Sequence, residues 1–66
     1  MDVKYPNITV VLVGTDGNAL AIVGKVKRAL RNNFVPDNEI DEFVKDALSG
    51  DYDHVLQTCM KWVNVE

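Results

Sequence analysis

The sequence predicts an α+β domain in which three helices pack on a short two-stranded sheet, in the order β-α-α-α-β. Three observations predict this fold. A run rich in β-branched residues, Ile8–Val13, precedes a turn and a stretch with apolar residues at helical spacing. Two later segments repeat that helical spacing, and the last residues alternate as a strand does. The alternative is a small all-α bundle with an extended arm.

The first predicted strand, Ile8–Val13, follows an entry arm made of residues 1–7. Its only polar residue is Thr9, so we expect the strand to be covered on both faces or to keep only a narrow solvent edge. Pro6 has no backbone N–H, and we expect it to keep the strand from beginning earlier. The length of 66 residues predicts a single domain, residues 1–66.

The first predicted helix follows the turn at residues 14–18 and runs from Ala19 to Asn32 or Asn33. Asn18 or Asp16 is suited to accept a backbone N–H at its start. Gly24 costs about 1 kcal/mol relative to alanine inside a helix, so we expect another element to approach closely there. The predicted apolar side is the set of residues at helical spacing, widened by Ile22: Ala19, Leu20, Val23, Val26, Ala29 and Leu30.

The second predicted helix begins at Pro36, after Phe34 and Val35 dock apolar groups at the turn, and stops at Ser49-Gly50. Its outer face is acidic. Its predicted core residues follow the same helical spacing: Ile40, Phe43, Val44, Ala47 and Leu48.

The third predicted helix starts after Asp51, which is suited to be its N-cap, and stops near Lys61 or Trp62. We expect the tail that follows to be extended and to pair beside Ile8–Val13. One face of this helix carries the apolar residues, and Trp62 lies off that face: Tyr52, Val55, Leu56, Cys59, Met60 and Val63.

Charge is unevenly divided along the chain, whose net charge is −3. Residues 1–36 carry five Lys or Arg and two Asp, whereas residues 37–66 carry two Lys and eight Asp or Glu. We therefore expect a basic side and an acidic side. A single cysteine, Cys59, excludes an intramolecular disulfide and favours a cytoplasmic setting. The sequence predicts neither a signal peptide nor a membrane span.

The leading functional hypothesis is a non-enzymatic protein-interaction module, either a monomer or a homodimer. Its contacts would come from the basic first helix, the acidic second helix or Trp62, which either seals the core or is exposed as an interface anchor. A nucleic-acid-associated protein is the alternative for the same helix, although no aromatic residue is interleaved with its cations and the chain is acidic. The candidate basic residues are Lys25, Lys27, Arg28 and Arg31.

The turn before the first helix is a second alternative site, for a phosphate or a small ligand. Small residues next to free N–H groups at a helix start attract anions. The turn does not match the usual Gly-rich phosphate-binding motifs, and Asp16 would repel a phosphate. Turn and capping chemistry explain the same residues without any ligand: Gly14, Thr15, Gly17 and Asn18.

No catalytic, metal-binding or cofactor-binding set is predicted. His54 and Cys59 are five residues apart and do not share a helix face closely, and four zinc ligands are not available without weak carboxylates. An acidic cluster lacks the alternating ligands and central glycine of a calcium loop, and its spacing is that of a solvated helix face: Asp37, Glu39, Asp41, Glu42 and Asp46.

Three segments together resemble a family of small uncharacterised proteins of bacteria, mobile elements and phages. The segments are VG-x-DGNA at 13–19, SGDYDH at 49–54 and WV-x-VE at 62–66, and the likeness spans nearly the whole chain. The resemblance implies a cytosolic prokaryotic or viral setting and no particular reaction or ligand.

Overall fold

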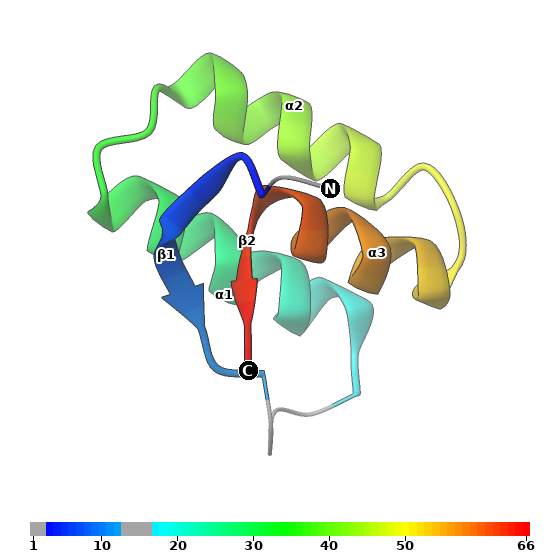
Figure 1. Ribbon diagram of the computed structural model, residues 1–66. Coiled ribbons are helices and arrows are strands. Elements are labelled where there is room, and N and C mark those ends of the chain that lie inside the picture. The colour runs from blue at the N-terminus through cyan, green and yellow to red at the C-terminus, as the bar shows by residue number, and fades with distance from the viewer. Residues whose placement is uncertain (1–2, 13–16) are drawn as a thin grey trace.

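The computed structural model describes residues 3–12 and 17–66 and has the predicted order β-α-α-α-β (Figure 1). The described residues form one sheet, in which two strands run parallel, and all three helices lie between them in the chain. No helix of this described part is long and apolar enough to cross a membrane. The elements are β1 Tyr5–Val10, α1 Ala19–Asn32, α2 Asp37–Ala47, α3 Tyr52–Trp62 and β2 Val63–Val65.

The first strand begins earlier than predicted, at Tyr5, inside the predicted entry arm. Pro6 is accommodated because the pairing between β1 and β2 is irregular around it: Tyr5 is opposite Val63, but the next paired residue, Thr9, is opposite Asn64. The side-chain amide of Asn64 donates a hydrogen bond to the Pro6 carbonyl within this gap. A proline is tolerated at such an interruption, since no ladder N–H is needed there.

The strand is covered on one face only, which corrects the expectation of a strand sheltered on both. Ile8 and Val10 are 3% and 4% exposed, whereas Thr9 is exposed and Val11 is 50% exposed. Because side chains alternate along a strand, one face meets the helices and the other meets water. In Figure 1, α1 lies behind the two strands, α2 crosses above them and α3 lies beside β2.

The predicted helix boundaries at residues 18–19 and 51–52 are confirmed by two side-chain caps. The Asn18 carboxamide oxygen accepts from the Leu20 N–H at 2.9 Å, and the Asp51 carboxylate accepts from the His54 N–H at 2.9 Å. Each cap satisfies a backbone donor that has no partner within its helix. The other capping candidate, Asp16, lies outside the described residues.

The core is formed by the inner faces of the helices and by the covered face of the sheet, and most predicted core residues belong to it. Trp62 was predicted to lie off the main apolar face of its helix, but its side chain is only 7% exposed. Trp62 is the last residue of α3 and directly precedes β2, so its side chain lies where the helix meets the sheet. Four residues of the predicted apolar faces are exposed instead. Leu20, Leu48 and Tyr52 lie at helix ends, and Met60 lies on the outer side of α3.

Gly24 does not have the close neighbour that was predicted for it. A Cβ atom built at this position would meet no atom within 4 Å. Gly50 is the opposite case, because a Cβ there would lie 2.9 Å from both Cβ and Cγ of His54. The glycine that packing requires is therefore in the turn between α2 and α3.

Candidate interaction surface

The most unusual residue of the described surface is Phe34, in the turn between α1 and α2. Its side chain is 94% exposed, and its backbone has a φ of 64°, in the left-handed region. The sequence led us to expect Phe34 and Val35 to dock together, but only Val35 is buried. A bulky residue with positive φ is an outlier, because its Cβ approaches its own carbonyl oxygen.

The turn around Phe34 has the hydrogen bonds of a Schellman motif. The Phe34 N–H donates to the Arg31 carbonyl and the Val35 N–H donates to the Leu30 carbonyl, each at 3.1 Å. Both Val35 and Leu30 are buried in the core, and an apolar contact between these two positions usually accompanies this motif. Glycine is the common residue at the position that Phe34 occupies. The sequence signal was therefore available: a helix that ends in an aromatic residue where glycine is expected.

The basic residues predicted from the sequence lie on α1, which leads into this turn. Lys25, Arg28 and Arg31 are exposed and Lys27 is half-buried. Among the described residues, no salt bridge joins Lys27, Arg28 or Arg31 to the acidic side chains of α2. Arg31 is three residues before Phe34 and lies in the last turn of α1, so the helix carries positive charge into the turn that holds the exposed ring.

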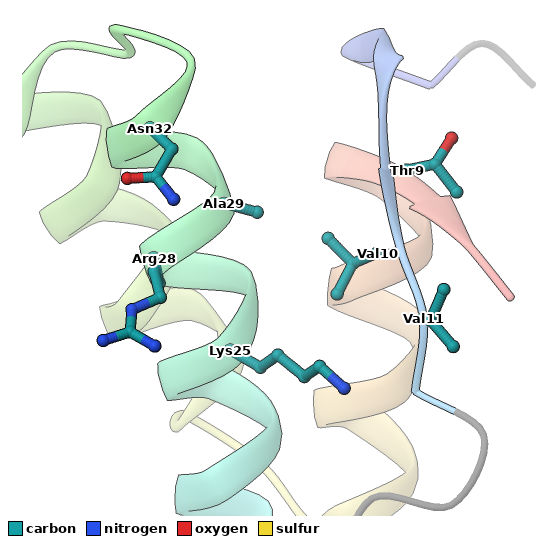
Figure 2. Close-up of a pocket in the computed structure, with 7 residues that line it drawn as sticks. All are labelled: Thr9, Val10, Val11, Lys25, Arg28, Ala29 and Asn32. Carbon is teal, nitrogen blue, oxygen red and sulfur yellow. The ribbon is translucent and has the colours of Figure 1, made fainter.

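A shallow groove of about 210 Å³ separates α1 from β1 (Figure 2). Figure 2 shows the Val10 side chain pointing from β1 toward α1, and the Lys25 side chain reaching from α1 toward β1. Lys25 also has an interaction partner of its own. The walls combine apolar groups with two cations and an amide, and no carboxylate: Thr9, Val10, Val11, Lys25, Arg28, Ala29 and Asn32.

Trp62, the remaining predicted interface residue, belongs to an aromatic cluster that seals the core. Its ring packs edge-on against Phe43 at a centroid distance of 5.5 Å and stacks on Tyr5 at 6.1 Å. The Lys4 ammonium lies 4.2 Å from the centroid of the Trp62 ring. Of the two roles considered for Trp62, the structure therefore shows the packing role.

Glu39, in the first turn of α2, bonds to two residues of this cluster. Its Oε1 accepts from the Tyr5 hydroxyl at 2.6 Å and lies 3.0 Å from the Lys4 ammonium. The hydrogen bond to Glu39 raises the pKa of Tyr5 to about 12. The same bond, with the Lys4 ammonium, holds the pKa of Glu39 below its usual value. The start of β1 is thus attached to both α2 and α3, so this acidic residue has a structural partner.

The predicted anion site at the first turn is only partly described. Gly14 and Thr15 lie outside the described residues. Gly17 and Asn18 are exposed, and the Asn18 side chain is engaged as the cap of α1. This cap gives Asn18 a structural role that requires no ligand.

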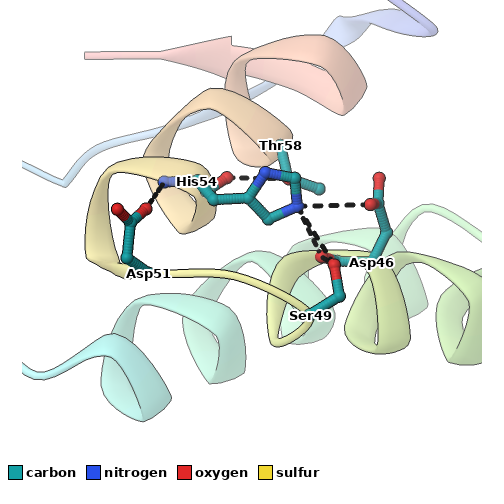
Figure 3. A network of polar contacts seen from close by, with 5 residues as sticks. All are labelled: Asp46, Ser49, Asp51, His54 and Thr58. Atoms are coloured by element: carbon teal, nitrogen blue, oxygen red, sulfur yellow. Dashed lines mark hydrogen bonds and ion pairs between the residues drawn. The ribbon is translucent and has the colours of Figure 1, made fainter.

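A polar network at the turn between α2 and α3 brings Ser49, His54 and Asp46 together (Figure 3). His54 Nε2 lies 3.2 Å from Ser49 Oγ, 3.3 Å from Asp46 Oδ1 and 2.8 Å from the Asp46 carbonyl oxygen. A catalytic triad uses opposite ring nitrogens for its serine and its carboxylate, whereas here both lie at Nε2. The Ser49 hydroxyl donates to the Asp46 carbonyl at 2.6 Å. The network therefore acts as a cap on the end of α2.

Cys59, the other residue considered for chemistry, lies in the core. Burial raises the pKa of its thiol to about 11, which leaves the thiol protonated at neutral pH. Within residues 3–12 and 17–66, no three His, Cys, Asp or Glu side chains gather in a way that could hold a metal ion.

No protein-family model, no curated protein and no solved structure matches this chain. The resemblance to small bacterial and phage proteins stays a prediction. The interpretation of function therefore depends on the molecule's own surface.

Proposed function

We propose that this protein is a non-enzymatic protein-interaction module whose partner binds the turn at Phe34 and the basic side of α1. The observation that carries this proposal is the Phe34 ring, exposed at 94% on a backbone with positive φ. Its conformation is disfavoured by roughly 1–2 kcal/mol for an L-residue, and its ring buries almost nothing in return. Strained residues of this kind are often kept for function.

The charge next to Phe34 indicates the kind of partner. Arg28 and Arg31 are exposed on the last two turns of α1. Aromatic and arginine side chains are the residues that contribute most to protein interfaces. The proposed partner is therefore a protein with an apolar pocket for Phe34 and carboxylates around it.

Capture of partners from the source cells with three tagged variants tests this proposal. Phe34→Gly removes the ring and relieves the backbone, so we expect it to lose the protein that the wild type retains. Leu20→Ala is the matched control, because Leu20 is an exposed apolar residue at the other end of α1, at 67% exposure, and its loss should leave capture unchanged. Phe34→Trp keeps an aromatic ring and should retain the partner. Equal capture by Phe34→Gly and the wild type would contradict the proposal.

An exposed aromatic ring in the turn that follows Arg28 and Arg31 also supports the second candidate, binding of single-stranded nucleic acid. Bases stack on aromatic side chains, and phosphates pair with nearby cations. The net charge of −3 opposes this candidate. Titration with a labelled oligonucleotide at two salt concentrations distinguishes it, because phosphate contacts weaken steeply as salt rises. Absence of binding at low salt would remove it.

The phosphate alternative at Gly14–Asn18 has weaker support, since the Asn18 side chain already caps α1. Amide shifts confined to Gly17 and Asn18 on addition of inorganic phosphate would favour it. A cytoplasmic setting belongs to the main proposal, because the single cysteine is a buried free thiol.

A further inference from the structure

The strand β1 pairs with β2 along one edge and has no strand on the other among the described residues. The Val10 carbonyl accepts from the Glu66 N–H at 2.9 Å, and the Leu12 N–H donates to the Glu66 carbonyl at 2.6 Å. Successive residues of a strand direct their backbone groups to opposite edges. The N–H and C=O groups of Thr9 and Val11 therefore point away from β2, along the edge that has no strand.

The groove between β1 and α1 lies beside these backbone groups (Figure 2). Thr9 and Val10 line it from β1, Val11 lines it just after the end of the strand, and Ala29 lines it from α1. An unpaired strand edge is a template for another strand. Natural proteins often protect such an edge with charged side chains or a covering element. Here Thr9 and Val11 give it no charge, and both are exposed.

We propose that this edge binds an extended acidic peptide segment of the partner protein, which adds to β1 as a further strand. The inference rests on the proposed function, because it names the partner segment of the same basic side of α1. The backbone of the segment would hydrogen-bond to Thr9 and Val11. A carboxylate on the segment would pair with Arg28, which lines the groove from α1. Figure 2 draws the Arg28 guanidinium on the side of α1 away from β1, so this exposed side chain would turn toward the bound segment.

Charge decides between this occupant and a second copy of the chain. A symmetric pairing of two β1 edges would bring both copies' Arg28 side chains to the same junction. Like charges placed across an interface are unfavourable, whereas carboxylates on a peptide are attracted to the same groups. The chain itself contains an example of such a segment. On its other edge, β1 pairs with the valine-rich strand Val63–Val65, which is followed by the acidic residue Glu66.

A titration of the labelled full chain by amide NMR, with a capped seven-residue peptide that alternates valine and glutamate, tests the inference. We expect saturable shifts at the amides of Thr9 and Val11, and slower hydrogen exchange of both. The same peptide with lysine in place of glutamate should bind at least about tenfold more weakly, since one lost ion pair of about 1.4 kcal/mol is tenfold in affinity. Equal binding of the two peptides would overturn the inference.

Two charge-reversal variants separate contact at the groove from bulk electrostatics. Arg28→Glu should weaken glutamate-peptide binding about tenfold or more. Arg31→Glu makes the same change in charge on an exposed residue of α1 that does not line the groove, and should have a smaller effect. Equal losses in both variants, or shifts away from Thr9 and Val11, would overturn the inference. Both variants should keep the wild-type amide spectrum elsewhere, because both sites are exposed.

The peptide experiment and the capture experiment fail independently. The peptide titration can be repeated on Phe34→Gly, which leaves Thr9, Val11 and Arg28 unchanged, and the shifts at the edge should persist. A peptide that does not bind the edge would refute strand addition while leaving the Phe34-dependent capture as it stands. Tight binding of an oligonucleotide at the same amides, in place of the peptide, would also refute the acidic-peptide proposal.

Discussion

The turn between α1 and α2 and the turn between α2 and α3 differ in how well their residues suit the backbone. Each must end one helix and start the next within a few residues. The turn between α2 and α3 places Gly50 where any Cβ would meet His54, and it satisfies the Asp46 carbonyl with the Ser49 hydroxyl and His54 Nε2. Every one of these features favours the folded state.

The turn between α1 and α2 contains a residue that folding does not favour. Its hydrogen bonds and its Val35 contact follow the Schellman pattern, but the position that suits glycine holds Phe34. The ring lies in water at 94% exposure. The comparison of the two turns indicates where to look for function in a small domain: at a position whose backbone favours one residue type but which holds another.

Gly50→Ala should have the largest effect on stability. The new Cβ would lie 2.9 Å from two atoms of His54, so the turn must shift or the His54 contacts must break. We expect a loss of roughly 1–3 kcal/mol in the free energy of unfolding, as for other overpacked sites, measured by urea denaturation. Unchanged stability would show that the turn between α2 and α3 is looser than its contacts indicate.

Asp51→Ala removes the cap of α3 at the same turn. The Asp51 carboxylate accepts from the His54 N–H, and alanine leaves this donor to water. The expected loss is about 1 kcal/mol, measured in the same denaturation series. Asp51→Asn is the matched control, because asparagine also caps helices well and should restore most of the loss. Equal destabilisation by both substitutions would contradict the capping role.

Gly24→Ala is the counterpart of Gly50→Ala, because a side chain at position 24 would meet open space. No atom lies within 4 Å of the place that the new methyl group would take, and alanine is the better helix former. We therefore expect a gain of up to about 1 kcal/mol, seen as a rise in the urea midpoint with an unchanged slope. A loss of stability would mean that the outer side of α1 is covered.

The smallest expected effects concern pH and the cluster at Tyr5 and Glu39. The pKa of Tyr5 is raised from 10.0 to about 12, so its contribution to stability is complete below pH 10 and is lost as the pH rises through 12. The lowered pKa of Glu39 has the opposite sign: its contribution is present above pH 4.5 and is lost as the pH falls through the folded-state value.

Tyr5→Phe tests this pH dependence in thermal unfolding measured across the pH range. The variant should lose less stability than the wild type between pH 10 and 12, because it has no phenol to ionise. It should also lose less on acidification, because Glu39 no longer accepts the hydroxyl. Identical pH profiles for the two proteins would show that the Tyr5–Glu39 bond does not contribute.

Much of the architecture could be predicted from local patterns. Helical spacing located the three helices, and the side chains of Asn18 and Asp51 marked two of their starts. The alternating tail predicted that β2 pairs beside β1. The early start of β1 could not be predicted, because Pro6 is tolerated only through an irregular register and a side-chain bond from Asn64.

The candidate surface was only partly predictable. The cations of α1 were visible in the sequence, but the exposure of Phe34 and the burial of Trp62 depend on how the helices are placed. An apolar residue in a turn is normally expected to pack. The aromatic residue at the glycine position of the helix end was the available sequence signal, and the structure adds that Phe34 has a positive φ and lies in water while Val35 takes the core position.

The most direct test of the central claim is the free energy of unfolding of Phe34→Gly, measured with urea beside the wild type. If Phe34 is retained against local stability, glycine should raise the free energy of unfolding by about 1 kcal/mol, which corresponds to about 4–8 °C in Tm. A clear loss of stability would show that the ring supports the fold, and would contradict the claim that Phe34 is held exposed for a partner.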